Sequence, residues 1–253
     1  EHFKARKFIT GFSGSAGTAV ITKTEARLWT DGRYFIQAAA QLEGTTVELM
    51  KMGETGVPEM NAYIEEVLKE GETLGFDGIV VSDGEGEGYA AIAGKNNAKV
   101  NYQVDLIDEI WEDRPVLSEE PAFNLDVKYA GETVASKLAR IREEMKEAGT
   151  NVHVVSTIDD ICWTLNIRGN DIHCCPVVLS YLVMTQDEIL LFANEKAFDT
   201  AVRNSLEKDG VVLKPYNDIY QYVKTIPESR TVLLSRKNAN SRLVSSLPDS
   251  VKI

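Results

Sequence analysis

The feature that most constrains the fold of this chain is an internal repeat. Residues 20–31 align without a gap with residues 183–194, an offset of 163 positions. The shared positions are Val20/Val183, Thr22/Thr185, Glu25/Glu188 and Leu28/Leu191; Trp29 and Phe192 are both aromatic, and the same offset matches Phe35 with Phe198 and Ala38 with Ala201. A period this long indicates two duplicated domains rather than a solenoid of short repeats.

Each copy alternates strand-like and helix-like segments. Short β-branched runs predict strands, and apolar residues three and four positions apart predict helices. In the first copy we expect strands at 18–22, 26–30, 47–52 and 73–76, and helices at 33–42, 58–69 and 84–95. In the second copy we expect strands at 152–156 and 177–184, and helices at 133–148 and 158–165. The predicted fold class is therefore α/β, with two duplicated domains that each form a mixed sheet flanked by helices.

Two residues indicate where predicted helices begin and end. Pro58 is expected in the first turn of its helix, where the missing N–H does no harm. Gly149 is expected to end the helix at 133–148 as its C-terminal cap.

Domain boundaries follow from the length and from a break in periodicity. A chain of 253 residues accommodates two domains, since domains usually span ~100–200 residues. The periodicity fails over residues 115–131, a stretch that contains Pro115 and Pro121. We therefore expect a first domain over residues 1–114, a linker over 115–131 and a second domain over 132–253. The second copy has a helix and a strand before its repeat for which the first copy has no room, so we expect the chain to start inside its first domain.

Composition argues against two classes of partner. The chain carries 27 Lys and Arg against 39 Asp and Glu, a net charge of −12. That average field repels nucleic acid and anionic membranes, and no apolar run is long enough to cross a bilayer. The three cysteines, two of them adjacent, form no disulfide framework, which favours a reducing compartment and a cytoplasmic location.

The glycine-rich segment from Gly11 to Gly17 fits neither of two catalytic motifs. It has Ser15 where a nucleophile elbow needs its last glycine, and its glycines stand three apart, unlike those of a dinucleotide-binding loop. We interpret it as a tight turn of small residues that leads into the strand at 18–22.

Neither the His173-Cys174-Cys175 segment nor the paired acids form a catalytic or metal centre. Adjacent strand residues point to opposite faces, so three consecutive ligands cannot converge on one ion. We interpret this segment as the entrance of the next strand. Asp159 and Asp160 come just before a predicted helix, where carboxylates cap free N–H groups. Read alone, the chain offers no catalytic residue and no metal ligand.

The densest polar and aromatic segment runs from Trp29 to Tyr34. Gly32 is expected to turn the chain from strand to helix, with Asp31 near the helix N-terminus and Arg33 at the corner. Two interpretations stay open. Arg33 forms a local clamp with Asp31 or another carboxylate, or its planar fork reaches a carbonyl or carboxylate of a ligand or partner domain.

Several segments together resemble one family. They are residues 8–20 (Phe-Ile-Thr-Gly-Phe-Ser-Gly-Ser-Ala-Gly-Thr-Ala-Val), 28–35 (Leu-Trp-Thr-Asp-Gly-Arg-Tyr-Phe), 108–115 (Asp-Glu-Ile-Trp-Glu-Asp-Arg-Pro), 159–163 (Asp-Asp-Ile-Cys-Trp) and 165–171 (Leu-Asn-Ile-Arg-Gly-Asn-Asp). In this order they resemble the N-terminal region of the long, three-domain Xaa-Pro aminopeptidases (aminopeptidase P). The resemblance covers nearly the whole chain and is strongest over residues 8–42 and 159–181.

The resemblance implies a fold and a division of labour. In that family two creatinase-like α/β domains precede a C-terminal "pita-bread" domain. That domain binds two divalent metal ions, usually manganese, through two aspartates, a histidine and two glutamates. No position here matches those ligands, so the catalytic domain is absent from this chain and the chain alone is expected to be inactive. Of the family's functional residues only Arg33 has a counterpart, which implies that Arg33 contacts bound peptide, with weaker support from Asp31 and Tyr34.

The expected function is the non-catalytic N-terminal part of a metallo-aminopeptidase that removes the first residue from peptides with proline in second position. The chain would shape substrate access, contact its own C-terminal catalytic domain and contribute to a homodimer. Two alternatives stay open. One is a binding module of an inactive pita-bread homologue, such as the large subunit of the FACT histone chaperone; the other is the N-terminal part of a prolidase or creatinase relative.

Overall fold

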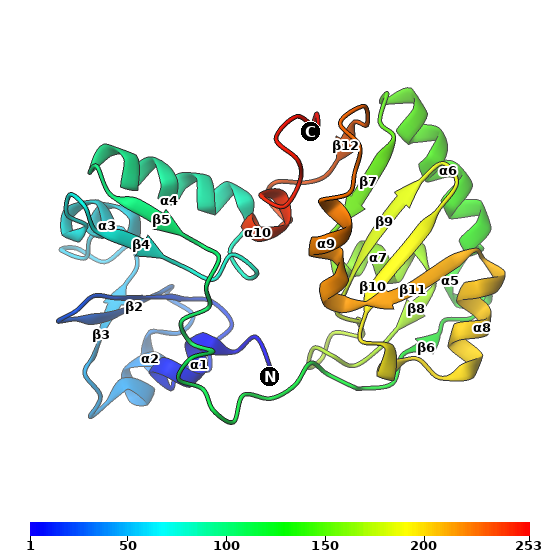
Figure 1. Cartoon of the computed structure of the whole chain (residues 1–253). Helices are drawn as coiled ribbons and strands as arrows, with labels where there is room; N and C mark the ends of the chain where they lie inside the picture. Colours follow the sequence, from blue (N-terminus) through cyan, green and yellow to red (C-terminus); the bar gives the residue numbers. More distant parts are fainter. The chain divides into compact units, whose positions relative to one another are not determined.

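The computed structural model describes residues 1–253, which group into two compact units. Unit 1 comprises residues 1–77 and 86–116; unit 2 comprises residues 78–85 and 117–253 (Figure 1). Each unit has its own mixed sheet and helices and is described by itself.

The main sheet of unit 1 begins with a hairpin. Strand β1 (Thr18–Ile21) runs antiparallel to β2 (Ala26–Thr30), and β2 runs parallel to β3 (Val47–Lys51). The crossover from β2 to β3 contains α2 (Phe35–Leu42). Leu28 of β2 and Ala38 and Leu42 of α2 pack with Phe12 in one core cluster.

The remaining elements of unit 1 form a second, smaller layer. Strand β4 (Thr73–Gly75) pairs in parallel with β5 (Lys99–Asn101). Helices α3 (Met60–Val67) and α4 (Asp83–Lys95) contribute Ile64 and Ile92 to a shared cluster. Helix α1 (Ala5–Thr10) precedes the hairpin.

Two helices of unit 1 start later than the sequence predicts. Helix α2 begins at Phe35 rather than residue 33, because the Asp31 side chain accepts a hydrogen bond from the Arg33 backbone N–H at 3.0 Å and forms a separate turn. The prediction that Pro58 lies in the first turn of α3 is wrong. Pro58 precedes the helix, and its carbonyl accepts a hydrogen bond from the Trp29 indole at 2.9 Å.

Unit 2 contains a five-stranded sheet in the order β11-β10-β9-β7-β12. Its strands are β7 (Val152–Val155), β9 (Ser180–Thr185), β10 (Ile189–Ala193), β11 (Val211–Pro215) and β12 (Val232–Leu233). Only β9 runs antiparallel to its neighbours. Every residue of β10 is buried, as expected for a central strand that is covered on both faces.

The helices of unit 2 carry clear end signals. Helix α6 (Val134–Glu147) starts after Thr133, whose side chain accepts the Ser136 N–H. It ends as predicted at Gly149, which has a φ of 67°. The Gly149 N–H donates to the Lys146 carbonyl and the Thr150 N–H to the Met145 carbonyl, a paired C-terminal cap. The other elements are β6 (Phe123–Asn124), α5 (Val127–Ala130), α7 (Ile158–Thr164), β8 (Ile167–Arg168), η1 (Glu195–Ala197), α8 (Thr200–Lys208), η2 (Tyr216–Asp218), α9 (Ile219–Val223) and α10 (Ser241–Val244).

The duplication read from the sequence is present in the fold. The hairpin β1–β2 corresponds to β9–β10, and in both units the second hairpin strand pairs in parallel with the strand after the next helix. One detail of the ungapped alignment is wrong. Ala38 is buried, whereas Ala201 is exposed and Val202 is buried instead. Six residues separate β10 from α8 whereas four separate β2 from α2, so the second copy has two extra residues between its strand and its helix.

The segment that we expected to be a linker carries structure of its own. Strand β6 pairs with β8, and from residue 117 onward the chain belongs to unit 2. Residues 78–85 also belong to unit 2, although they lie in the sequence between β4 and the body of α4.

Candidate functional site

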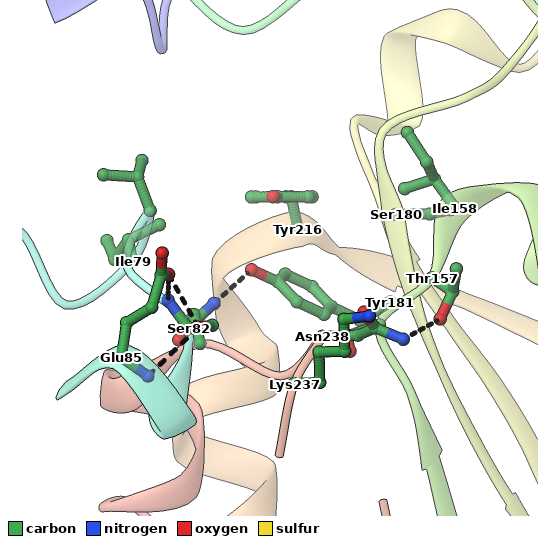
Figure 2. Close-up of a pocket in the computed structure, with 13 residues that line it drawn as sticks. Ile79, Ser82, Glu85, Thr157, Ile158, Ser180, Tyr181, Tyr216, Lys237 and Asn238 are labelled. Carbon is green, nitrogen blue, oxygen red and sulfur yellow. Dashed lines mark hydrogen bonds between the residues drawn. The ribbon is translucent and has the colours of Figure 1, made fainter. Parts of the chain in front are cut away.

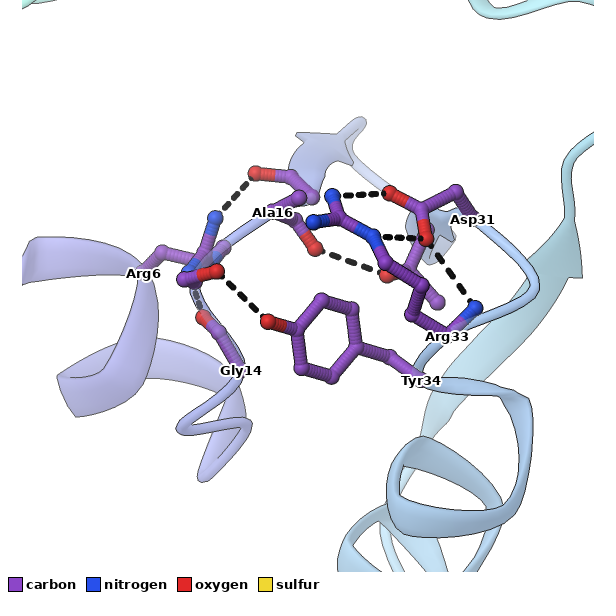
Figure 3. A network of polar contacts seen from close by, with 9 residues as sticks. Arg6, Gly14, Ala16, Asp31, Arg33 and Tyr34 are labelled. Carbon is purple, nitrogen blue, oxygen red and sulfur yellow. Dashed lines mark hydrogen bonds and ion pairs between the residues drawn. The ribbon is translucent and has the colours of Figure 1, made fainter.

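The corner between β2 and α2 brings together the three residues that the sequence singled out. Asp31 accepts three hydrogen bonds from Arg33: from the backbone N–H at 3.0 Å, from Nε at 2.9 Å and from Nη2 at 2.7 Å. The Arg33 Cζ lies 5.3 Å from the centroid of the Tyr34 ring (Figure 3). We name Asp31, Arg33 and Tyr34 the unit 1 corner.

The pair of charges at this corner remains open to solvent. The Arg33 side chain is 68% exposed and that of Asp31 is 35% exposed. Hydrogen bonds from Arg33 lower the pKa of Asp31 to about 2, so the carboxylate stays charged in neutral solution. Because Asp31 occupies Nε and Nη2, the Nη1 edge of the guanidinium is left for another acceptor. The structure thus shows the local clamp between Arg33 and Asp31.

The glycine-rich segment is a tight loop before β1, as predicted, and it lies against the corner. The Ser15 hydroxyl and the Tyr34 hydroxyl form a hydrogen bond of 2.5 Å. The Thr30 hydroxyl donates to the Ala16 carbonyl at 2.7 Å. Arg6 of α1 donates to the carbonyls of Gly14 and Gly17 (Figure 3). No sequence pattern points to Arg6, because its partners are backbone atoms.

Unit 2 repeats this corner with different chemistry. Asn194 follows β10 as Asp31 follows β2, and its side-chain oxygen accepts the Lys196 N–H at 3.2 Å. Lys196 stands at the position of Arg33, but it pairs with Glu119 at 2.6 Å instead of with Asn194. The Asn194 side-chain amide donates to the Ser118 carbonyl at 2.9 Å. The Ala122 N–H donates to the Ala197 carbonyl at 2.8 Å. An extended segment of the same chain therefore occupies the unit 2 corner.

The His-Cys-Cys segment lies in a turn before the strand rather than at its entrance. The Cys175 N–H donates to the Ile172 carbonyl, and Cys174 has a φ of 60°. Strand β9 starts only at Ser180, because the Leu179 N–H bonds to the Asp171 carboxylate at 2.6 Å rather than to a neighbouring strand. No group of three or more His, Cys, Asp or Glu side chains is placed to hold a metal ion.

A cavity of about 410 Å³ opens at one edge of the unit 2 sheet (Figure 2). It adjoins the carboxyl ends of β7 and β11, the edge where α/β sheets commonly bind ligands. The lining residues are Ile79, Val80, Ser82, Glu85, Ser156, Thr157, Ile158, Ser180, Tyr181, Tyr216, Lys237, Asn238 and Asn240.

The tyrosines at this cavity are not poised for acid–base catalysis. Asn240 donates to the Tyr181 hydroxyl at 2.8 Å, and that hydroxyl lies 3.1 Å from the hydroxyl of Tyr220. Burial raises the pKa of Tyr216 to about 12 and raises the pKa values of Tyr181 and Tyr220 as well. These three hydroxyl groups stay protonated near neutral pH, so none of the tyrosines serves as a general base there.

The fold of two duplicated units, with a corner after each hairpin, defines a known class of domain. The chain belongs to the creatinase/prolidase N-terminal domain family: one family model matches residues 4–110 and a second matches residues 113–253.

Its relatives within that class are aminopeptidases. Aminopeptidase P2 of Arabidopsis thaliana is 41% identical over 92% of this chain and 33% of its own length. A probable Xaa-Pro aminopeptidase P of Coprinopsis cinerea is 38% identical over 95% of this chain and 39% of its own length. The crystal structure of X-prolyl aminopeptidase from Caenorhabditis elegans, a cytosolic enzyme with a di-nuclear active site, matches all of this chain with a TM-score of 0.92 and 31% identity. It is 42% covered.

These matches define what the chain corresponds to. It is similar to the N-terminal part of Xaa-Pro aminopeptidases and spans 33–42% of the length of the relatives described above. None of its helices has the length and apolar character needed to cross a membrane.

Proposed function

We propose that this chain is the non-catalytic, substrate-guiding part of a metal-dependent Xaa-Pro aminopeptidase that acts in the cytoplasm. The metal ions, for which we propose manganese, bind in a separate catalytic domain. The two N-terminal units limit access to peptide ends with proline in second position and contribute to a homodimer. Similarity along the whole chain to Xaa-Pro aminopeptidases supports this proposal.

Within this function Arg33 binds the peptide. The observation that carries this assignment is the comparison of the two corners. At the unit 2 corner, Lys196 pairs with a carboxylate and Asn194 with a backbone carbonyl of one extended segment. The unit 1 corner has the same backbone turn, a cation at the same position and no such segment across it. An exposed, clamped guanidinium suits a carboxylate or carbonyl of an extended peptide, and we assign the C-terminal carboxylate of short peptides to it.

The test is Arg33→Ala in the full-length enzyme. We expect KM for a free-acid Xaa-Pro-Xaa tripeptide to rise about tenfold with little change in kcat, because a contact that serves only to bind the peptide stabilises ground state and transition state equally. For the C-terminal amide of the same peptide, KM should rise much less. Lys95→Ala is the matched control, since Lys95 forms a similarly exposed ion pair with Glu65 in the same unit.

Two outcomes would count against the assignment. Unchanged KM for both peptides would return Arg33 to a purely local clamp. An equal rise in KM for the free acid and the amide would indicate that Arg33 binds a backbone carbonyl of the peptide rather than its carboxylate.

A further inference from the structure

Arg6 is a cation with no carboxylate partner. It lies half-buried on α1, and none of the ion pairs in the structure includes it. Burial lowers the pKa of its guanidinium. Its two Nη groups are both used on the carbonyls of Gly14 and Gly17. Since a partly desolvated charge without a counter-ion is costly, its position requires an explanation beyond surface solubility.

The segment that Arg6 holds, residues 14–17, contacts Tyr34 of the unit 1 corner and Thr30, the residue just before the corner. The carbonyl of Ala16 accepts from Thr30, which is fully buried and immediately precedes Asp31. The hydroxyl of Ser15 bonds to Tyr34, which immediately follows Arg33. We name residues 14–17 the brace loop.

The brace loop leaves no room for a side chain at either of its glycines. A Cβ on Gly14 would lie 2.3 Å from Phe12 Cζ and 2.8 Å from Tyr34 Cδ1. Gly17 has a φ of 154°, and a Cβ there would lie 2.9 Å from the Trp29 carbonyl oxygen. Each contact is shorter than real Cβ atoms tolerate, so both positions require glycine.

The unit 2 corner needs no such device, because an extended segment of the chain already fixes it through Asn194 and Lys196. The unit 1 corner lacks that segment. Its Arg33 side chain is 68% exposed, and a free arginine at this exposure samples many rotamers that are lost on binding.

We infer that Arg6 is a positioning residue for Arg33, acting through the brace loop, Ser15 and Tyr34. The inference rests on the proposed role of Arg33 in peptide binding. Arg6 fixes the loop, and the loop fixes Thr30 and Tyr34. The Tyr34 ring and the Asp31 carboxylate then hold the guanidinium in one orientation before the peptide arrives. Such preorganisation improves binding by reducing the ordering that the ligand must impose.

A double-mutant cycle in the full-length enzyme tests this. Arg6→Lys keeps the charge but loses the two-carbonyl fork, and Tyr34→Phe removes only the hydroxyl that bonds to Ser15. Each should raise KM for the free-acid tripeptide about three- to tenfold with kcat unchanged. If both act through Arg33, neither should raise KM further in an Arg33→Ala background, because residues in one network are not additive.

The control and the contrary outcomes are specific. Tyr63→Phe removes a tyrosine hydroxyl that donates to Glu25 at 3.0 Å in the same unit but away from the corner, and it should leave KM unchanged. If Arg6→Lys or Tyr34→Phe raised KM by the same factor in the Arg33→Ala background as in the parent enzyme, Arg6 and Tyr34 would act independently of Arg33. That result would overturn the inference. Tyr34→Phe provides this test even if Arg6→Lys fails to fold. A rise in KM for Arg33→Ala alone, with none for Arg6→Lys or Tyr34→Phe, overturns the inference but keeps the proposed function; no rise for Arg33→Ala overturns both.

Discussion

His153 illustrates how one side chain can make the stability of a unit depend on pH. It lies on β7, and its Nδ1 atom is buried without a hydrogen-bond partner. Burial lowers the pKa of this imidazole below its ordinary 6.5, while Asp160 acts weakly in the opposite direction. The folded chain therefore keeps His153 neutral at pH values where the unfolded chain protonates it.

The sign of the effect follows from proton binding. Between the ordinary pKa of 6.5 and the lower folded pKa, the unfolded state binds more protons, so the free energy of unfolding falls as pH falls. We expect His153→Gln to reduce the difference in stability between about pH 7 and about pH 5, measured by urea unfolding at each pH. His173→Gln, which replaces an exposed imidazole, should leave that difference as it is. If His153→Gln left the stability difference between the two pH values unchanged, that difference would come from carboxylates instead.

At the residue scale, sequence predicts contacts between neighbours better than contacts with the backbone. The pairing of Asp31 with Arg33 could be anticipated because only Gly32 separates them and their charges are opposite. Arg6 could not, since the carbonyls it binds carry no sequence signal. Lys137 was equally hidden. It is 1% exposed and donates to Asn166 and to the Trp163 carbonyl, contacts that depend on how α6 packs on α7.

At the element scale, replacing glycine by alanine should have opposite effects on stability at two helix positions. Gly149 has a φ of 67° in the cap of α6, whereas Gly88 lies in the exposed interior of α4. A Cβ at either position meets nothing within 4 Å. Only backbone conformation therefore distinguishes the two sites.

We expect Gly149→Ala to lower the free energy of unfolding by about 1 kcal/mol, because alanine resists the left-handed conformation. Gly88→Ala should raise it by about 0.5–1 kcal/mol, because alanine favours the helix. Chemical denaturation of the two variants beside the parent measures both. If the two substitutions had the same sign, conformational preference would not be the deciding factor.

The long elements were predictable and the short ones were not. The first hairpin and α6 have enough residues for alternation or helical periodicity to show. Strand β5 has three residues and β12 has two, too few for any periodic signal, and their pairing is decided by distant strands. The two extra residues before α8 could not be predicted either, because the strands before them align without gaps.

At the scale of the whole molecule, the two structural units do not coincide with two continuous stretches of chain. Residues 78–85 belong to unit 2. The carbonyls of Gly78 and Val81 accept from Arg242 and Ser241, and the N–H groups of Asp83 and Gly84 donate to Ala239 and Arg236. The Arg236 guanidinium also pairs with the Asp83 carboxylate at 2.6 Å.

These contacts predict the behaviour of a fragment. A chain of residues 113–253 alone should unfold at a lower denaturant concentration than unit 2 does within residues 1–253, because four backbone hydrogen bonds, worth about 0.5–1.5 kcal/mol each, and an ion pair are lost. A synthetic peptide of residues 77–86 should restore part of the loss, and a scrambled peptide should not. Equal midpoints for the fragment and the longer chain would show that these contacts contribute nothing.

The same segment limits how such proteins can recombine. A crossover between two relatives at residues 110–113, where one family match ends and the next begins, would combine residues 78–85 of one parent with the Arg236 to Arg242 surface of the other. Chimeras should therefore be viable when residues 78–85 and 236–242 come from the same parent, whatever the origin of the rest.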